Sequence, residues 1–355
     1  MGARLDRLRA EMACRDIDAM LITCEVNQSW CADFDFTDGY ILVCREKAYL
    51  ITDPRYIEAA RAEADPDFEC VCAAPDLSDM LLSYLSDNGA KRVGIEDTEL
   101  SYYDAMRFKS ALEPCEIAVT GSMLDELRAK KDEDEISRII EAQRLTDAAF
   151  DHILGYIREG VSEIDIALEL EFFMRRAGAD GASFDIIVAS GSASSRPHAV
   201  PRNVKIERGL LTMDFGCKYK GYCSDMTRTV CFGGATAEEK ALYNTVLKAQ
   251  RAALGFITDG VRCVDADRAA RDITEVEYKG LFSHSLGHGV GRRIHEAPRL
   301  SSRAGDRRLS SGHVVTVEPG IYIEGKFGCR IEDMLIIRDG YAQNITKSPK
   351  ELIEI

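Results

Sequence analysis

Five residues of this chain have the types and the spacing needed to hold metal ions: Asp214, Asp225, His288, Glu318 and Glu332. Four of them are carboxylates, and they lie in segments rich in Val, Ile, Leu and Met that predict β-strands. Carboxylates gathered in apolar surroundings repel one another unless a cation neutralises them. A pair of divalent ions about 3.5–4 Å apart would satisfy such a cluster and supply hydrolytic chemistry.

The spacing of the two aspartates predicts that they meet across a hairpin. Asp214 lies in LLTMDFG and Asp225 lies in YCSDMTRTV, and their midpoint falls between Tyr219 and Lys220. A tight turn at that point would place the two carboxylates directly opposite each other. Residues opposed in this way have Cβ atoms only ~4.5–5.5 Å apart.

The two glutamates repeat this arrangement around a glycine. Glu318 lies in VVTVEPG and Glu332 lies in CRIEDMLII, and Gly325 lies midway between them. Each hairpin would therefore present a like-charged pair to one place. With one imidazole, four carboxylates and no thiolate, the predicted site suits Mn²⁺, Co²⁺ or Fe²⁺ as readily as Zn²⁺.

Histidines are concentrated in one segment. The chain has only six, and the segment FSHSLGHGVGRRIHEAP contains His284, His288 and His295. Its alternating glycines favour an extended, closely approached backbone over a helix. Neither a zinc-protease HExxH nor a dinucleotide GxGxxG pattern is present there. His198, in ASGSASSRPHAVP, is predicted to lie on a loop and would alone be read as background.

Composition restricts the class of protein. The net charge of −15 argues against a nucleic-acid partner, which requires a basic face. No apolar run reaches the length of a membrane-spanning helix, and the first residues have no apolar signal core. The twelve cysteines are scattered and form no CxxC pair. Reduced thiols in a cytoplasmic protein are therefore expected.

Two domains are expected from the length of 355 residues and from the element pattern. Residues 1–122 alternate between helix-like and strand-like segments, which predicts a small α/β domain. Residues 123–355 open with a long charged helix that carries an apolar stripe, continue with a helix capped by Ser162 and Asp165, and contain all five candidate ligands. The strands expected in the first domain are Ala19–Thr23, Gly39–Cys44, Ala48–Thr52 and Arg92–Ile95.

The candidate residues lie in motifs that resemble a known family. MDFG, YCSDMTRTV, HSLGHGVGRRIHEAP, TVEPGIY and GCRIEDM are similar, in this order, to the motif set of the pita-bread metallopeptidases, in particular the aminopeptidase P and prolidase branch. The resemblance extends to the N-terminal part through TDPRY. It implies an α+β protein, with a C-terminal pita-bread (creatinase/aminopeptidase) fold preceded by a smaller α/β creatinase-like domain.

The resemblance also implies a role for each ligand. Asp214 would bind one metal, and His288 and Glu318 would bind the other. Asp225 and Glu332 would bridge the two metals. Glu318 additionally resembles the carboxylate that takes the proton of the attacking water.

Further residues match family positions around the substrate. His198, His284 and His295 correspond to histidines that contact the substrate and stabilise the developing oxyanion, and Arg330 corresponds to an arginine that supports the metal ligands. The implied enzyme is a metallo-exopeptidase that hydrolyses the peptide bond before proline with a hydroxide held between two divalent ions, foremost Mn²⁺. Proline-containing peptides would be its substrates, and a homodimer is expected.

Several alternatives remain open at this level. The enzyme could be an Xaa-Pro aminopeptidase acting on longer peptides or an Xaa-Pro dipeptidase. Arg292 and Arg293 could bind a substrate carboxylate or be solvated, and Arg299 and Arg303 are further candidates for such a clamp. A metal-free creatinase-like amidinohydrolase and a non-catalytic pita-bread binding protein are the alternatives outside the peptidases. Both of these predict no stoichiometric metal.

Overall fold

The computed structural model describes residues 3–355, and the chain divides into two compact units, Met1–Arg128 and Ala129–Ile355. The domain boundary expected after residue 122 falls at the start of helix α6 (Met123–Ala129) and stays a prediction. Within the described residues, no helix is both long enough and apolar enough to cross a membrane. All twelve cysteines are free thiols.

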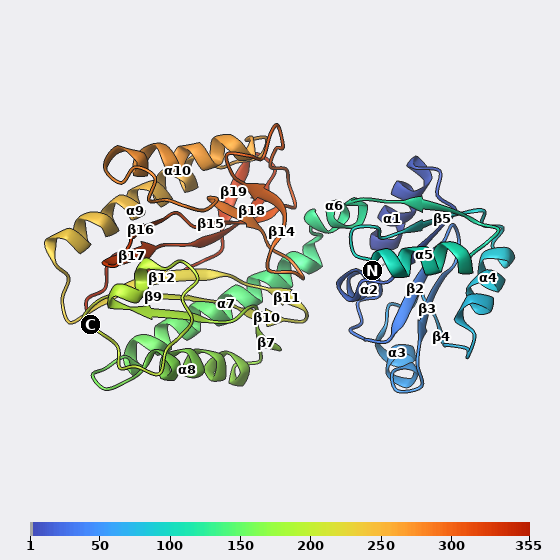
Figure 1. The fold of residues 1–355 in the computed structure, drawn as a ribbon, viewed down its shortest axis with the longest axis horizontal. Coiled ribbons are helices and arrows are strands. Elements are labelled where there is room, and N and C mark those ends of the chain that lie inside the picture. Colours follow the sequence, from blue (N-terminus) through green and yellow to red (C-terminus); the bar gives the residue numbers. More distant parts are fainter. Residues whose placement is uncertain (1–2) are drawn as a thin grey trace. The chain divides into compact units, whose positions relative to one another are not determined.

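The first unit is built on a six-stranded mixed sheet with helices on both faces (Figure 1). Its strand order is β4-β3-β2-β1-β5-β6. Successive residues of β1 enter different apolar clusters: Met20 packs with α1, α2, α3 and α6, whereas Leu21 packs with α4 and α5. The strands are β1 (Ala19–Ile22), β2 (Gly39–Cys44), β3 (Ala48–Thr52), β4 (Glu69–Cys72), β5 (Arg92–Ile95) and β6 (Glu116–Val119), and the helices before α6 are α1 (Ala3–Cys14), α2 (Glu25–Ala32), α3 (Ile57–Glu63), α4 (Leu77–Asp87) and α5 (Tyr102–Ala111).

The strands predicted in this unit are confirmed, with β2, β3 and β5 at the expected bounds. Helix α2 was not predicted, because EVNQSWCA carries no apolar stripe. It forms because tertiary partners satisfy its buried polar side chains. The Gln28 amide, for example, donates to the carbonyl oxygens of Ile22 and Gly39 at 3.1 and 2.8 Å.

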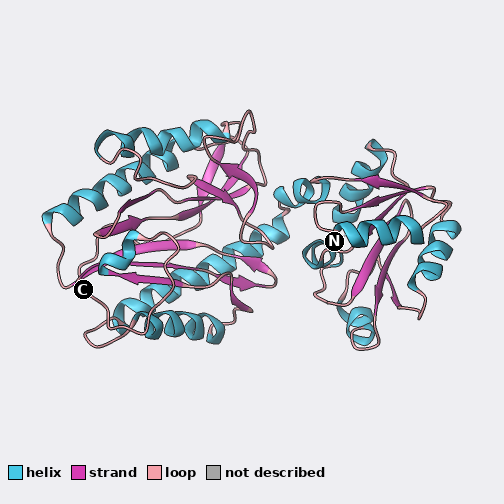
Figure 2. Ribbon diagram, in the orientation of Figure 1, coloured by secondary structure: helices cyan, strands magenta, loops and turns pink. Residues whose placement is uncertain are grey.

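The second unit consists of two similar halves, each with a helix pair packed on strands (Figures 1 and 2). Helices α7 (Glu133–Tyr156) and α8 (Glu163–Arg176) share an apolar core with β8, β9 and β12, whereas α9 (Ala237–Phe256) and α10 (Cys263–Glu277) share another with β14, β15 and β18. Capping boxes begin α7, α8 and α9, and the predicted Ser162–Asp165 cap is one of them. The α+β architecture expected from the motifs is confirmed.

The strands of the second unit form short antiparallel sheets. The sheet β12-β9-β8 belongs to the first half, and the sheet β14-β13-β15-β18-β19 belongs to the second half. The strands are β7 (Gly181–Ala182), β8 (Ile187–Ser190), β9 (Gly209–Phe215), β10 (Cys217–Tyr219), β11 (Tyr222–Cys223), β12 (Met226–Phe232), β13 (Gly287–Gly289), β14 (Glu296–Leu300), β15 (Val314–Val317), β16 (Gly320–Ile323), β17 (Phe327–Arg330), β18 (Asp333–Arg338) and β19 (Tyr341–Asn344).

The hairpin that carries the two aspartates has a different register from the expected one. Asp214 faces Thr227, so the prediction that it directly faces Asp225 was wrong. The turn residues are Lys220 and Gly221, both with positive φ (48° and 77°), as a two-residue hairpin turn of the primed type requires. Asp225 comes two residues before Thr227 in the sequence, and residues two apart in a strand share one face. The two carboxylates are therefore diagonal neighbours on one face.

The hairpin that carries the two glutamates has the predicted register. β16 pairs with β17 around Gly325, whose φ is +71°. β15 pairs with β18 in the same register, from Val317 facing Asp333 onward. Glu318 and Glu332 lie at the junction of these two ladders and face each other as expected.

Candidate functional site

The five candidate ligands converge from five separate segments, each within or next to a strand. One ligand atom each of Asp225, His288 and Glu332 lies within 4.8 Å of the others. The His288 Nε2 atom is 3.5 Å from an Asp225 oxygen and 3.4 Å from a Glu318 oxygen. The Nδ1 atom of His288 is 3.0 Å from the carbonyl oxygen of Gly289, which orients the ring so that Nε2 faces the carboxylates.

Gly287 and Gly289 allow the His288 segment to come this close. A Cβ atom at Gly287 would lie 2.0 Å from the Thr316 carbonyl oxygen, and one at Gly289 would lie 2.2 Å from the Ala297 carbonyl oxygen. The extended backbone predicted from the alternating glycines is confirmed in β13. Only glycine permits the neighbouring strands to hold His288 at this depth.

Two buried carboxylate oxygens fit a cation. Among the described residues, neither Asp214 Oδ1 nor Glu332 Oε1 has a hydrogen-bond partner, although both atoms are buried. The other oxygen of each residue is bound: Arg330 Nη2 donates to Asp214 Oδ2 at 2.6 Å, and the Thr227 hydroxyl donates to Glu332 Oε2 at 2.7 Å. Buried polar atoms without a partner are rare, and oxygen atoms are the ligands that hard divalent ions prefer.

The pKa values of the site residues also fit a bound cation. Burial, followed by repulsion from Glu332, raises the pKa of Asp225 well above its usual range, and burial with repulsion from Glu318 does the same to the pKa of Glu332. Burial also raises the pKa of Glu318 to about 8, and burial lowers the pKa of His288 to about 3. A neutral imidazole therefore lies beside carboxylates whose ionised forms need a nearby cation. This combination is the donor set of a metal centre.

Tyr322 is a member of the site that sequence reasoning missed. Its hydroxyl accepts a 2.7 Å hydrogen bond from Arg330 Nη1 and lies 3.0 Å from His284 Nε2. The Tyr322 hydroxyl thus connects His284 and Arg330, two predicted site residues that lie on different segments. The sequence signal was the tyrosine in TVEPGIY together with Gly320, where a Cβ atom would lie 2.3 Å from the Tyr322 hydroxyl oxygen.

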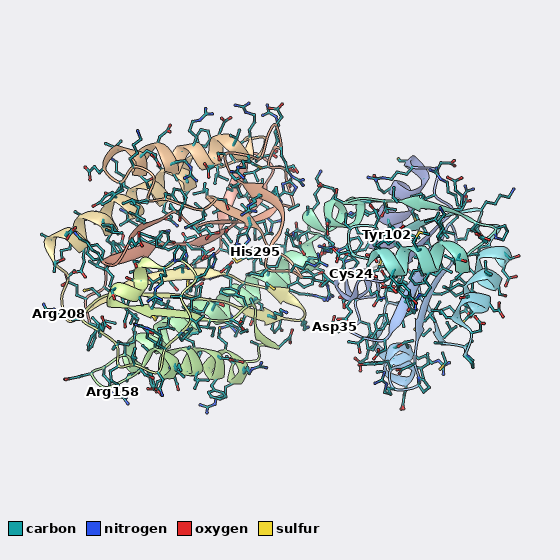
Figure 3. The ribbon with its side chains drawn as sticks, in the orientation of Figure 1. Cys24, Asp35, Tyr102, Arg158, Arg208 and His295 are labelled. Atoms are coloured by element: carbon teal, nitrogen blue, oxygen red, sulfur yellow. The ribbon has the colours of Figure 1, made fainter. Side chains whose placement is uncertain are left out.

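The ligands lie in the wall of a cavity of about 870 Å³. His284 and two exposed histidines, His198 and His295, line the same cavity, and Figure 3 marks His295 just before β14. An apolar wall that includes Phe184, Ile187, Val200 and Ile294 accompanies them. The cavity therefore combines a polar, charged surface with an apolar one, which suits a peptide.

The four arginines near His295 have different surroundings. Arg299 is exposed and lines the cavity, with its Nε atom 3.4 Å from the Ser285 hydroxyl oxygen. Arg292 is only 8% exposed and lies over the Tyr222 ring at 4.9 Å, so it is not a solvated side chain. Arg303 is exposed and Arg293 is partly buried. Arg299 is thus the best placed of the four to meet a substrate carboxylate.

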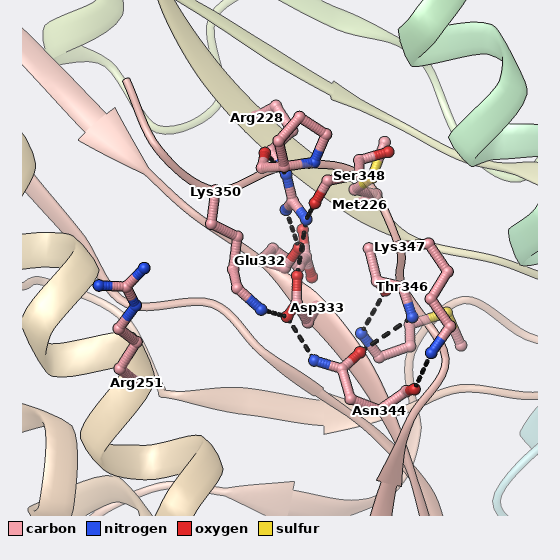
Figure 4. A network of polar contacts seen from close by, with 12 residues as sticks. Met226, Arg228, Arg251, Glu332, Asp333, Asn344, Thr346, Lys347, Ser348 and Lys350 are labelled. Atoms are coloured by element: carbon pink, nitrogen blue, oxygen red, sulfur yellow. Dashed lines mark hydrogen bonds and ion pairs between the residues drawn. The ribbon is translucent and has the colours of Figure 1, made fainter. Parts of the chain in front are cut away.

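A buried network holds the backbone beside Glu332 (Figure 4). Arg228 donates to the Glu332 carbonyl oxygen at 2.5 Å, to Asp333 Oδ1 at 2.8 Å and to the Ser348 carbonyl oxygen at 2.8 Å. Asp333 also accepts 2.6 Å hydrogen bonds from Lys350 and Asn344. The segment that follows β19 is thereby attached to the strand that begins immediately after Glu332.

Comparison with known proteins gives consistent matches over the whole chain. Residues 137–339 match the model of metallopeptidase family M24, and residues 4–130 match that of the creatinase/prolidase N-terminal domain. An uncharacterized peptidase of Bacillus subtilis is 41% identical over 99% of both chains. The structure of an Xaa-Pro dipeptidase from Bacillus anthracis is 43% identical, covers 99% of both chains and superposes with a TM-score of 0.94.

The structure of an X-Pro aminopeptidase from Thermotoga maritima is also similar. It is 35% identical, covers 98% of this chain and 100% of its own, and has a TM-score of 0.91. The resemblance inferred from the motifs is thereby confirmed at the level of the family. The chain belongs to metallopeptidase family M24, and its metallopeptidase domain is preceded by a creatinase/prolidase N-terminal domain.

Proposed function

We propose that this enzyme is an exopeptidase that hydrolyses the peptide bond before proline and depends on two divalent metal ions. The observation that carries the proposal is the convergence of four carboxylates and one neutral imidazole at a cavity of about 870 Å³. The similarity to an Xaa-Pro dipeptidase and to an X-Pro aminopeptidase supports the specificity for proline.

Asp214, Asp225, His288, Glu318 and Glu332 would hold the metals. When bound, the ions would supply Lewis-acid chemistry, polarising the scissile carbonyl and lowering the pKa of a water molecule. We assign Mn²⁺ as the metal because the donor set is dominated by carboxylate oxygens, and Co²⁺, Zn²⁺ and Fe²⁺ suit the same donors.

The side chains around the metals have separate tasks. Glu318 takes up the proton that the attacking water loses, and its Oε1 atom is steadied by the Thr316 hydroxyl at 3.2 Å. His284 is held in orientation by the Tyr322 hydroxyl at 3.0 Å and by the Ser285 carbonyl oxygen at 2.9 Å, and its ring contacts the substrate near the scissile bond. His198 and His295 contact the substrate from the exposed side of the cavity.

Arg330 connects a metal ligand with the residue that holds His284. Its guanidinium donates to Asp214, Thr227 and Tyr322, at 2.6, 3.0 and 2.7 Å. A planar fork with this many donors orients one oxygen of Asp214 and leaves the other free for a cation. Its task is therefore to orient the Asp214 carboxylate and the Tyr322 hydroxyl.

Proline is selected by shape, because its imide nitrogen carries no hydrogen for a protein acceptor to recognise. We assign this selection to the apolar wall of the cavity, which includes Phe184, Ile187, Val200 and Ile294. Exposed Arg299 would bind the terminal carboxylate of a dipeptide, which favours the dipeptidase form of the proposal.

We further propose a cytoplasmic homodimer. The twelve free thiols suit a reducing compartment. The metal-free amidinohydrolase and the non-catalytic binding protein are disfavoured, because each would leave the buried, mutually repelling carboxylates of Asp225, Glu318 and Glu332 without a cation.

The test is hydrolysis, with Mn²⁺ added, of Ala-Pro and Ala-Pro-Ala beside an Ala-Ala-Ala control. Cleavage of Ala-Pro alone identifies a dipeptidase, and cleavage of the tripeptide at its Ala-Pro bond identifies an aminopeptidase. Equal cleavage of the control removes the specificity for proline. Metal analysis of the purified protein by mass spectrometry accompanies the assay, and a protein that binds no divalent metal contradicts the dimetal mechanism.

A further inference from the structure

The loop that carries His198 is attached at both ends to a single buried carboxylate. This loop comprises residues 191–201, between β8 and Arg202, and its second half lines the cavity. His198 itself is exposed at the cavity. The loop contains two prolines and small residues, so its conformation depends on how its ends are held.

Glu163, the first residue of helix α8, supplies this attachment and is fully buried. On the β8 side, the backbone N–H and the hydroxyl of Ser190 each donate to Glu163 Oε1 at 2.8 Å. On the other side, the backbone N–H and Nε of Arg202 each donate to Oε2 at 2.9 Å, and Nη2 donates to Oε1 at 2.7 Å. One carboxylate thus receives five hydrogen bonds and connects the residues that flank the loop.

The carboxylate of Glu163 is held in its ionised form. Burial by itself would raise the pKa of Glu163, but the hydrogen bonds from Arg202 and Ser190 lower it. An ionised acceptor between two sets of donors forms stronger bonds than a neutral one. The distance between the two ends of the loop therefore depends on the ionised carboxylate of Glu163, which lies outside the metal centre.

The interior of the loop is seated on the strand that leads to Arg330. The backbone N–H of Gly328 donates to the Ser194 hydroxyl at 3.0 Å, and Arg330 Nη1 donates to the Pro197 carbonyl oxygen at 3.3 Å. These contacts fix the height of the loop above β17 but do not fix the separation of its ends. A backbone hydrogen bond from Ile164 N–H to the Arg202 carbonyl oxygen, at 3.3 Å, holds one end of the loop on helix α8, and the Glu163 carboxylate joins that end to Ser190.

We propose that Glu163 is a positioning residue for the peptidase reaction: by joining Ser190 to Arg202, it holds His198 in place against the substrate. This inference rests on the substrate role proposed for His198. Replacing Glu163 with glutamine keeps the shape and one acceptor oxygen, but it places an NH₂ group against N–H donors. The loop ends would then separate, and His198 would lose its position although it remains chemically intact.

The first test compares Glu163→Gln with Glu239→Gln. Glu239 is a matched control because it is also buried at the start of a helix, where it accepts hydrogen bonds from Thr236 N–H and hydroxyl at 2.7 and 2.8 Å. We expect Glu163→Gln to accelerate hydrogen–deuterium exchange in residues 191–202 and to lower kcat/KM for the proline peptide by about ten- to a hundredfold. The control should change neither quantity, and both variants should retain the metal content of the wild type.

The second test is a double-mutant cycle with His198→Ala. If Glu163 acts through His198, the double variant is no slower than His198→Ala alone. Multiplied losses in the double variant, or unchanged exchange in residues 191–202 of Glu163→Gln, would overturn the inference while the role of His198 stands. Full activity of His198→Ala would instead refute the substrate role of His198, and the inference would fall with it.

Discussion

The hydroxyl of Thr227 offers a test of how a residue outside the candidate ligand set tunes a metal ligand to which it is hydrogen-bonded. Thr227 is fully buried, donates to Glu332 Oε2 at 2.7 Å and accepts from Arg330 Nε at 3.0 Å. Thr227→Val keeps the shape of the side chain and removes both hydrogen bonds. A hydrogen bond to a charged group contributes about 1.5–3 kcal/mol, which is the scale of the expected effect.

Removing the Thr227 hydroxyl should destabilise the metal-loaded protein more than the metal-free protein. Without a cation, burial and repulsion from Glu318 raise the pKa of Glu332, while the hydrogen bond from Thr227 lowers it. Metal binding requires the ionised carboxylate, which is the form that the hydroxyl stabilises. We therefore expect Thr227→Val to weaken metal binding by about 10- to 100-fold, equivalent to about 1.4–2.7 kcal/mol.

The assay is titration calorimetry of the metal-free protein with Mn²⁺, with Thr229→Val as the control. Thr229 is buried in the same strand, but its hydroxyl donates to the Arg330 carbonyl oxygen at 3.0 Å and pairs with the Thr212 hydroxyl at 3.0 Å. Both variants should lose stability, and only Thr227→Val should lose metal affinity to the stated extent. Unchanged affinity in Thr227→Val, or an equal loss in both variants, would refute the reasoning.

Three further predictions concern charge, orientation and specificity. After chelation, the free energy of unfolding should fall between pH 7 and 8 in urea melts, because the pKa of Glu318 is raised from 4.5 to about 8 and its carboxyl group ionises in the folded state over this range. The buried histidines, whose pKa is lowered from 6.5 to about 3, are neutral in both states above pH 7; metal-free protein that is more stable at pH 8 than at pH 7 would contradict this. Arg330→Lys, which keeps the charge but not the fork to Asp214 and Tyr322, should lower kcat by about 10- to 100-fold with both metals bound, and steady-state rates with metal analysis check it. Arg299→Ala should raise KM for Ala-Pro by about tenfold and leave KM for Ala-Pro amide, which lacks the terminal carboxylate, unaffected, and an equal change for both would exclude a carboxylate clamp.

Local periodicity and turn chemistry explain which parts of the fold were predictable. The strands β2, β3 and β5 and the capped helix α8 follow from patterns within a few residues. The register of the second hairpin followed from Gly325 at its centre. The register of the first hairpin did not, because the Lys220–Gly221 pair occupies the two positive-φ positions of the turn and places the turn beyond the midpoint between the two aspartates.

The sequence by itself determined the family, the order of the five ligand candidates and the kind of chemistry they can support. Those conclusions depend on residue types in short motifs. Only the tertiary structure determined that the Tyr322 hydroxyl joins His284 to Arg330, that Thr227 supports Glu332, and that Glu163 closes the His198 loop. These contacts join segments far apart in the chain, and no local pattern encodes them. Their geometry arises when separate strands and helices pack against one another.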